Sequence, residues 1–207
     1  MPSSRRRKEA RPGELIAAAL ELFTERGFAA TRLDDVAARA GVSKGTVYLY
    51  FDSKEELFEA VVREAILPVL AQGEVMVEQH VGDMASLLRS MLHGWWSMVG
   101  ATPLAGVPKI VLSEARNFPE LARSYNEAVI QRGRRLMARV IACGVERGEF
   151  RAIDVEATID SLMSPLLFLA VWRSSLAQCC PSATVDPQQF IDRHLDLVLN
   201  GLVPRSA

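Results

Sequence analysis

The chain has 207 residues, of which 49% are hydrophobic and 7% aromatic, so it can bury a real core in one or two domains. Its 24 basic and 25 acidic residues nearly cancel, which argues against binding nucleic acid through bulk charge. No run of about 18 uncharged apolar residues occurs, and no apolar run follows the basic N-terminus. We therefore expect neither a transmembrane helix nor a signal peptide.

The positive charge is concentrated at the N-terminus. The cationic residues there are Arg5, Arg6, Arg7, Lys8 and Arg11, against the single acid Glu9. Two interpretations stay open: a solvated terminus, or an arm that lies on phosphates or enters the minor groove beside a DNA-binding element. We expect residues 1–12 to be disordered in the free chain.

Residues 31–58 contain three predicted helix starts and one tight turn. Thr31 followed by Asp34 fits a helix start in which the threonine hydroxyl accepts a hydrogen bond from a free backbone N–H. Gly41 is expected to end this first short helix, because glycine adopts the left-handed backbone conformation at least cost. Ser43 is the candidate N-cap of the next helix.

The second short helix is predicted over residues 44–50, and Ser53 with Glu56 forms the capping box of a third helix. Two short helices joined by a glycine turn are helix-turn-helix architecture. A helix of about seven residues spans roughly 10 Å, close to the width of the major groove, about 12 Å. Because its polar face offers a lysine, two hydroxyls and two phenol rings, this segment predicts a DNA-reading element.

The stretch from Leu15 to Phe58 resembles the DNA-binding domain of the TetR family of bacterial transcriptional regulators. The matching motifs are AALELF (18–23), RGF (26–28), Thr31, VA (36–37), AGVS (40–43), GTVY (45–48), YF (50–51) and SKEEL (53–57). The resemblance implies a cytoplasmic transcriptional regulator whose usual mode in the family is repression. The implied DNA-binding residues are Thr31, Arg32, Ser43, Lys44, Gly45, Thr46, Tyr48, Tyr50 and Lys54.

The positions that match the family imply separate roles for these residues. Thr31 should bind phosphate through its hydroxyl and nearby amides, and Tyr50 and Lys54 should also contact phosphates. Thr46 and Tyr48 are the expected base-facing residues.

Two further positions of the second helix bear on DNA contact. Lys44 could reach a guanine edge or a phosphate, and Gly45 permits close approach of the backbone. Leu49 interrupts the polar surface, and it faces either the core or a thymine methyl group.

The rest of the chain predicts helices separated by proline, glycine and polar breaks. Their expected ranges are 54 into the seventies, 84–99, 104–115, 119–148, 154–175 and 187–203. With three helices before them, this gives an all-α protein of about nine helices. We expect an arm at 1–12, a helix-turn-helix DNA-binding domain at 13–53, and an effector-binding and dimerisation domain at 54–207, with the helix from 54 as the connecting lever.

The last two long helices are candidates for a subunit interface. The helix at 154–175 is apolar nearly all round, so it is either buried within one subunit or shared between two. The resemblance implies that it and the helix at 187–203 form a four-helix homodimer interface. A twofold dimer would present two reading helices to a palindromic operator.

The C-terminal domain is also expected to hold a small-molecule effector. Candidate lining residues are Met91, Trp95, Trp96, Phe118, Met163, Leu166 and Phe168. The alternative is that these side chains are ordinary core. Pro165 within an apolar helix suggests a kink beside a cavity, and such a lining would suit a lipophilic or aromatic ligand of little charge.

The sequence offers little support for metal binding, redox sensing or enzyme activity. The cysteines are Cys143, Cys179 and Cys180, and the histidines are His80, His93 and His194; none has metal-ligand spacing. The adjacent cysteines either sense oxidants or are incidental reduced thiols. No nucleophile, phosphate-loop or cofactor motif occurs, so we expect no cofactor and no enzyme activity. The alternatives are a coactivator of the same fold that does not bind DNA, and an enzyme using the C-terminal cavity.

Overall fold

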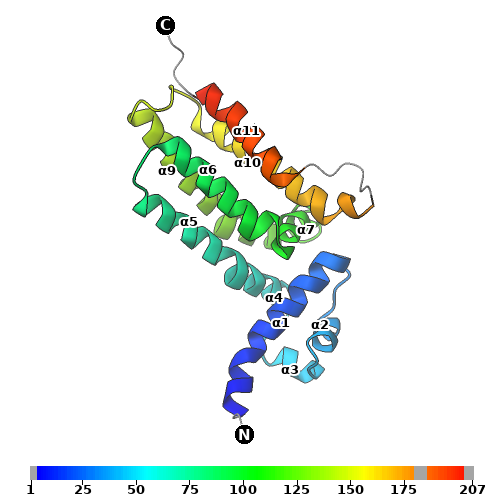
Figure 1. Ribbon diagram of the computed structural model, residues 1–207. Helices are drawn as coiled ribbons and strands as arrows, with labels where there is room; N and C mark the ends of the chain where they lie inside the picture. Colours follow the sequence, from blue (N-terminus) through cyan, green and yellow to red (C-terminus); the bar gives the residue numbers. More distant parts are fainter. Residues whose placement is uncertain (1–3, 180–185, 203–207) are drawn as a thin grey trace.

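The computed structural model describes residues 4–179 and 186–202, and for residues 4–11 and 178 it describes the backbone alone. The described chain contains α-helices with short π and 3-10 segments and no strand, which confirms the predicted all-α class (Figure 1). The α-helices are α1 (Ser4–Arg26), α2 (Leu33–Arg39), α3 (Lys44–Tyr48), α4 (Lys54–Val61), α5 (Leu67–Gln79), α6 (Met84–Trp95), α7 (Gly106–Glu114), α8 (Pro119–Tyr125), α9 (Gln131–Glu146), α10 (Val155–Ser174) and α11 (Pro187–Leu202).

Three π-helical segments interrupt the longer rods: η1 (Val62–Ile66), η2 (Trp96–Gly100) and η4 (Asn126–Ile130). Because η1 joins α4 to α5 and η4 joins α8 to α9, the eleven α-helices of the described chain form nine continuous rods, as predicted. Two 3-10 turns complete the described elements, η3 (Pro103–Ala105) before α7 and η5 (Leu176–Gln178) after α10.

The first helix is longer than expected. α1 begins at Ser4, so the backbone of residues 4–12 is helical, whereas we predicted disorder for residues 1–12. The physical reason is that arginine, lysine, glutamate and alanine are good helix formers. Turns added to an existing helix also avoid the cost of nucleation. Pro12 lies in the interior of α1, where a proline removes one backbone hydrogen bond and clashes with the carbonyl four residues earlier.

The turn between α2 and α3 follows from Gly41. Its φ angle is 67°, the left-handed region, and the amides of Gly41 and Val42 donate to the carbonyls of Ala38 and Ala37. This double closure satisfies carbonyls that the end of α2 leaves unpaired. The predicted glycine stop is therefore confirmed, and it directs the chain into α3.

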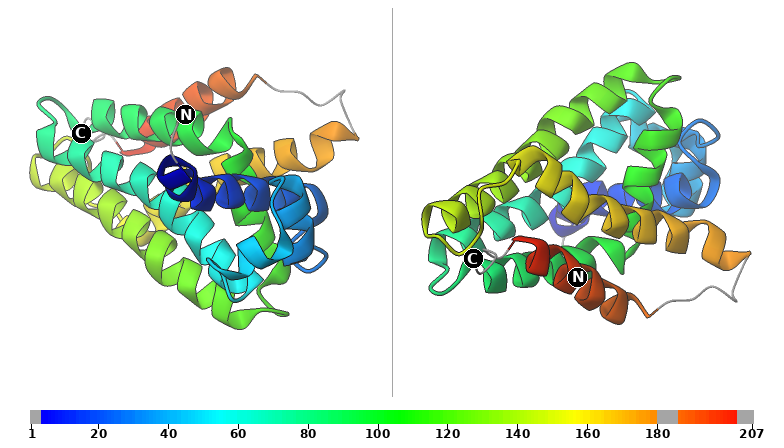
Figure 2. Two further views of the ribbon diagram at one scale, coloured as in Figure 1. Left: turned by 90° about the horizontal axis from the view of Figure 1, so that it is seen from below. Right: turned by 90° about the horizontal axis from the view of Figure 1, so that it is seen from above.

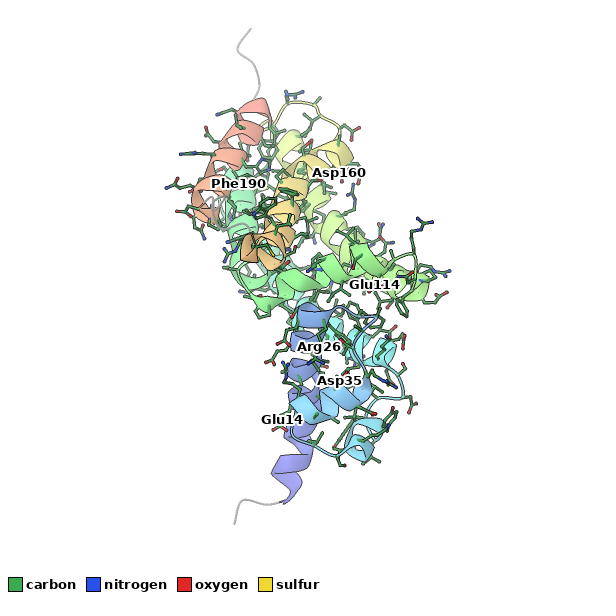
Figure 3. The ribbon with its side chains drawn as sticks, turned by 90° about the vertical axis from the view of Figure 1, so that its right-hand side faces the viewer. Glu14, Arg26, Asp35, Glu114, Asp160 and Phe190 are labelled. Atoms are coloured by element: carbon green, nitrogen blue, oxygen red, sulfur yellow. The ribbon has the colours of Figure 1, made fainter. Side chains whose placement is uncertain are left out.

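Two hydrophobic cores organise the molecule. The first joins α1 to α4 and η1 with α7 and α8, whose buried members are Val107, Ile110, Val111, Leu121 and Tyr125. The second joins α6, α9, α10 and α11. Figure 3 shows the helix that carries Glu114 lying directly over the end of α1 at Arg26, while Asp160 and Phe190 lie in the bundle beyond it. Packing therefore divides the chain differently from the predicted boundary at residue 53.

Among the described residues, α10 alone is long and apolar enough to cross a membrane, by length and composition only. In the structure it packs in the bundle against α7, α9 and α11. Ile159, Leu162 and Leu166 are buried in the second core. The view from above in Figure 2 shows α10 and α11 next to each other, and Figure 1 shows both at the end of the molecule remote from α2 and α3. We therefore describe α10 as a bundle helix with one face turned outward.

Candidate DNA-binding site and effector domain

The recognition helix α3 is held by its N-cap and by one buried residue. The Ser43 hydroxyl accepts from the Thr46 amide at 3.2 Å and lies 2.8 Å from the Thr46 hydroxyl. Val47 is fully buried in the first core. A five-residue helix is too short to be stable alone, so these contacts position it. Ser43 thus acts as a cap, as its sequence position predicted.

Lys44 is the cation at the start of α3. Its ammonium lies 2.8 Å from the Asp34 carboxylate of α2 and 5.8 Å from the centre of the Tyr48 ring. The hydrogen bond with Asp34 raises the pKa of Lys44 above its ordinary value, so the side chain stays charged. Because both partners of this pair are well exposed, a phosphate or a guanine edge could replace Asp34 at little cost.

The outer surface of α3 is open. A Cβ added at Gly45 would meet nothing closer than the Ser43 hydroxyl at 3.9 Å, so no neighbour in this chain requires glycine there. Tyr48 is 46% exposed, Leu49 is 81% exposed, and Arg32 is also exposed. Leu49 therefore faces outward rather than the core. This surface leaves room for a groove of DNA to approach closely.

Thr31 lies elsewhere than predicted. It is 1% exposed, and its hydroxyl donates to the carbonyls of Gly27 at 2.8 Å and Leu22 at 3.3 Å. Arg32 takes the N-cap position of α2 instead, and its amide donates to the Asp35 carboxylate at 3.2 Å. The threonine hydroxyl is used to close the end of α1, so in this structure it is not presented to phosphate.

Lys54 is also engaged within the protein. Its ammonium donates to the carbonyls of Phe28 and Ala29, both at 3.1 Å. It also lies 4.6 Å from the centre of the Phe28 ring and 5.1 Å from that of Phe118. The predicted phosphate contact of Lys54 stays a prediction, and in this structure its ammonium is engaged within the protein. The carbonyls left free where α1 ends attract the cation first.

Tyr50 is half-buried and packs against the first core. Its predicted contact with phosphate stays a prediction. Sequence reasoning missed Arg39, whose guanidinium contacts Glu21 and Glu25 at 2.8 Å each and ties α2 to α1. The sequence analysis also treated Asp34 only as part of a helix start and did not predict its ion pair with Lys44. Neither pair lies at a helical spacing, so no local pattern marks them.

The predicted effector residues divide into two groups. Trp96 and Leu166 are buried in the second core, and Met91, Trp95 and Met163 pack half-buried against it. Phe118 instead meets Phe28 at 4.9 Å between ring centres, in the first core. Phe168 is 64% exposed beside Trp172 on the outer face of α10. The structure therefore brings together five of the seven predicted residues.

An open cavity of about 390 Å³ lies between α10 and α11. Its lining residues are Arg151, Ile153, Asp154, Ala157, Thr158, Ser161, Leu197, Val198, Gly201 and Leu202. None of them is a predicted effector residue. Leu202 of this lining is buried in the second core, and Ile153 and Val198 pack against it, so the cavity opens at the edge of that core.

The remaining candidate sites show no metal chemistry. Within residues 4–179 and 186–202, no three His, Cys, Asp or Glu side chains are placed to hold a metal ion. Cys143 is half-buried and Cys179 is exposed, both as free thiols. Whether the adjacent Cys179 and Cys180 sense oxidants stays open, because Cys180 lies outside the described residues. His93 bridges α6 to α11, 2.8 Å from Asp192 and 2.9 Å from Gln188.

The geometry defines a class of protein: an all-α regulator whose helix-turn-helix unit is carried on a larger helical domain. Residues 15–61 match the family model described as bacterial regulatory proteins of the tetR family. Residues 78–177 match the model of the tetracyclin repressor-like C-terminal domain. The chain belongs to the TetR family of bacterial regulators, and it is a DNA-binding transcriptional regulator rather than an enzyme.

Curated relatives agree along most of the chain. The uncharacterized HTH-type transcriptional regulator YfiR of Bacillus subtilis is 30% identical over 155 residues, which cover 73% of this chain and 74% of that protein. The HTH-type transcriptional repressor KstR2 of Rhodococcus jostii is 27% identical over 197 residues, 94% of this chain and 92% of that one.

Solved structures share the fold. The fatty acid degradation regulator FadR from Bacillus halodurans has a TM-score of 0.77 at 22% identity, covering 94% of this chain and 97% of its own. FadR from Bacillus subtilis, in complex with stearoyl-CoA, has a TM-score of 0.76 at 21% identity, covering 91% and 98%. At these identities the likeness establishes the fold alone.

Proposed function

We propose that this regulator is a cytoplasmic repressor that binds a palindromic operator as a homodimer and is released by a lipophilic effector. The observation that carries the proposal is the open outer surface of α3, where Gly45, Tyr48 and Leu49 meet no neighbour that would block a DNA groove. Its buried face is anchored by Val47, so the helix is both exposed and rigidly placed.

The proposed contacts follow from that surface. Thr46 and Tyr48 read base edges, and Leu49 covers a thymine methyl group. Lys44 exchanges Asp34 for a phosphate or a guanine, and Arg32 contacts the backbone. Gly45 allows close approach, Ser43 holds the helix start, and Tyr50 reaches a phosphate.

The proposed dimer uses the outer faces of α10 and α11. Leu197 of α11 is 76% exposed and Phe168 of α10 is 64% exposed, so each helix carries a large apolar side chain on its outward surface. α10 is apolar on both faces, and only one face is used by the second core. A twofold partner would cover the other face and place two copies of α3 on one operator.

The proposed effector is a lipophilic acyl compound, and an acyl-CoA is the specific candidate. The B. subtilis FadR complex contains stearoyl-CoA, which supports this class. The apolar lining is Met91, Trp95, Trp96, Met163 and Leu166. To release the operator substantially, the effector must favour the non-binding state by several kcal/mol, because shifting an equilibrium from 1:99 to 99:1 takes about 5.5 kcal/mol.

Selection of bound sequences from a random DNA pool tests the proposal. We expect a palindrome to be enriched and stearoyl-CoA to lower its retention. Stearate, which is the same acyl chain without the CoA moiety, serves as the comparison ligand. An unenriched pool would refute operator binding and favour a coactivator that does not bind DNA. An enriched asymmetric site would refute the twofold dimer. An enriched palindrome that ignores stearoyl-CoA would refute the acyl-CoA assignment alone.

A further inference from the structure

The carboxylate of Asp34 lies beside the start of the recognition helix. Asp34 belongs to α2 and Lys44 is the first residue of α3, and the Lys44 ammonium donates to Asp34 Oδ2 at 2.8 Å. α2 and α3 pack against each other at the end of the molecule that carries the N-terminus of α1 (Figure 1). The Asp34 side chain is 46% exposed and that of Lys44 is 63% exposed. A charged acceptor and a charged donor therefore lie side by side on the outer surface of the helix-turn-helix unit.

Both side chains keep hydrogen-bonding capacity that the folded chain does not use. A lysine ammonium has three N–H donors, and a carboxylate has two acceptor oxygens. Among the residues whose side chains the structure describes, Asp34 is the one hydrogen-bond partner of the Lys44 ammonium, and no donor reaches Asp34 Oδ1. Two donors of Lys44 and one oxygen of Asp34 therefore remain available to DNA.

Asp34 differs from Asp35, the other acid of α2. The Asp35 carboxylate accepts from the Arg32 amide at 3.2 Å and so helps to start the helix. The partner of the Asp34 carboxylate is instead a side chain of α3. Phosphates repel a carboxylate, so an acid on this surface weakens binding to DNA of any sequence unless it gains a contact with a base. Asp34 therefore has an electrostatic cost on DNA and a free acceptor that can offset this cost.

The major-groove edge of a G·C pair has the complementary arrangement. Guanine presents two acceptors, N7 and O6, and cytosine presents the N4 amino donor. O6 and N4 are hydrogen-bonded to each other within the base pair, so they lie about 2.9 Å apart. The Lys44 ammonium and Asp34 Oδ2 are 2.8 Å apart, which is nearly the same spacing. A lysine on the guanine edge therefore places the neighbouring carboxylate over the cytosine of the same pair.

An A·T pair fits the two side chains less well. The N6 amino group of adenine offers Asp34 the same kind of donor that cytosine does. Thymine, however, presents one acceptor, O4, to an ammonium with two free donors, and its methyl group lies next to that acceptor. Guanine accepts both donors, at N7 and O6, so Lys44 favours the orientation in which Asp34 meets a cytosine.

We propose that Asp34 is a specificity-determining residue, which accepts a hydrogen bond from the N4 amino group of a cytosine while Lys44 donates to the guanine paired with it. The inference rests on the proposed function and narrows its Lys44 contact to guanine. The N-terminal residues of a recognition helix reach base edges, so the two side chains read one G·C position in each half-site. A cation in the groove still displaces counterions, so Lys44 keeps its share of the salt dependence.

Selection from a random DNA pool compares the full-length protein with Asp34→Ala, and Asp35→Ala is the matched control because it removes the same group from the next residue. Both variants lose one negative charge, so both should bind random DNA more tightly than wild type. Asp34→Ala alone should relax the preference for one G·C position in each half-site, by about fivefold or more. Because Asp35 takes part in a cap, Tm is recorded for each variant and binding is measured well below it.

A cytosine analogue that lacks the 4-amino group tests the contact itself. At the selected G·C position, it should weaken binding of the wild type about fivefold or more, and binding of Asp34→Ala less than about twofold. The guanine contact is tested with 7-deazaguanine, which lacks N7. This base should weaken binding of the wild type and of Asp34→Ala alike, and binding of Lys44→Ala little, because Lys44 is the residue that meets guanine.

The results separate this inference from the proposed function. If Asp34→Ala selects the same sequence as wild type and Asp35→Ala, or if the cytosine analogue weakens wild type and Asp34→Ala equally, then Asp34 only ties α2 to α3. The inference is then wrong, while operator binding stands. Relaxation of an A·T position in Asp34→Ala would overturn the assignment to cytosine. An unenriched wild-type pool would refute operator binding itself, and this inference with it.

Discussion

Gly106 offers the sharpest test of the contact between α7 and α1. Gly106→Ala adds a Cβ 2.3 Å from the Thr24 Cγ2, closer than real side chains approach, and 3.0 Å from the Thr24 Cβ, which is also a tight contact. Overpacking of this kind costs about 1–3 kcal/mol, while replacing a helical glycine by alanine returns roughly 0.5–1 kcal/mol. We therefore expect a net destabilisation of roughly 0.5–2 kcal/mol.

The assay is thermal unfolding followed by circular dichroism, together with operator affinity. A loss of that size should lower Tm by about 1–8 °C in a chain of this length. Operator affinity should fall as well, because the added methyl group at residue 106 pushes α1 away from α7. Gly133→Ala is the matched control, since its added Cβ would make an ordinary contact 3.6 Å from Leu70, and it should be neutral or slightly stabilising.

Removal of the opposing methyl group should rescue the variant. In Thr24→Ala the Cγ2 atom is absent, so the double variant should recover most of the lost Tm, a non-additivity expected of residues in contact. The threonine hydroxyl donates only to carbonyls of its own helix, so Thr24→Ala alone should cost little. If Gly106→Ala behaves like Gly133→Ala, or if Thr24→Ala gives no rescue, the close contact described above is wrong.

Other predictions concern DNA and the partner subunit. Lys44→Ala should reduce the steepness of the salt dependence of operator binding by about 1 per subunit, as loss of a phosphate contact does. Lys54→Ala should lower Tm but leave the salt dependence unchanged, and a reduced slope there would contradict its internal role. Thr46→Ala should alter the sequence enriched from a random pool, at a cost of about 1–3 kcal/mol for the preferred base; equal weakening on specific and random DNA would count against base contact. Leu197→Asp should give monomers in sedimentation, whereas Leu112→Asp on α7, where the leucine is about equally exposed, should leave dimers intact. The reverse result would show that the dimer interface includes α7 rather than α11.

The helix-turn-helix unit could be predicted from sequence because its signals are local. The glycine stop after α2 and the serine caps of α3 and α4 depend on residues within a few positions of each other, and all three are found where expected. Hydrophobic spacing likewise predicted the long helices, since helical period is a property of one segment. The joining of α7 and α8 to the DNA-binding core depends on three-dimensional packing, which no local pattern encodes.

The internal contacts of Thr31 and Lys54 have the same origin. Thr31 and Lys54 match family positions at helix starts, where an unpaired amide or a positive helix end would attract phosphate. In the folded chain, however, the carbonyls at the end of α1 lie beside both residues and take the hydroxyl and the ammonium as donors. Sequence spacing could not reveal this competition, because the carbonyls of residues 22, 27, 28 and 29 belong to a different helix end.

The engagement of Thr31 and Lys54 within the protein makes the basic N-terminal segment a candidate for further phosphate contacts. With Lys44 and Arg32 as the cations of the described reading surface, a dimer would neutralise about four phosphates, and log K would fall with log salt at a slope of about −3.6. The five cations of residues 1–12 would raise this to about −13 if all of them reached phosphates. Figure 1 shows the N-terminal end of α1 at the same end of the molecule as α2 and α3, within range of a shared DNA surface.

We therefore expect the full-length protein to bind its operator with a slope much steeper than about −4, and removal of residues 1–11 to bring it back near that value. The truncated chain would begin at Pro12, a residue suited to the first turn of a helix, so α1 should keep its buried face. The control is Tm, which truncation should change little because Leu15 and the residues after it supply the packing. Equal slopes for the two proteins would show that the segment stays off DNA. In that case the affinity of the operator complex would depend on the exposed face of α3 alone.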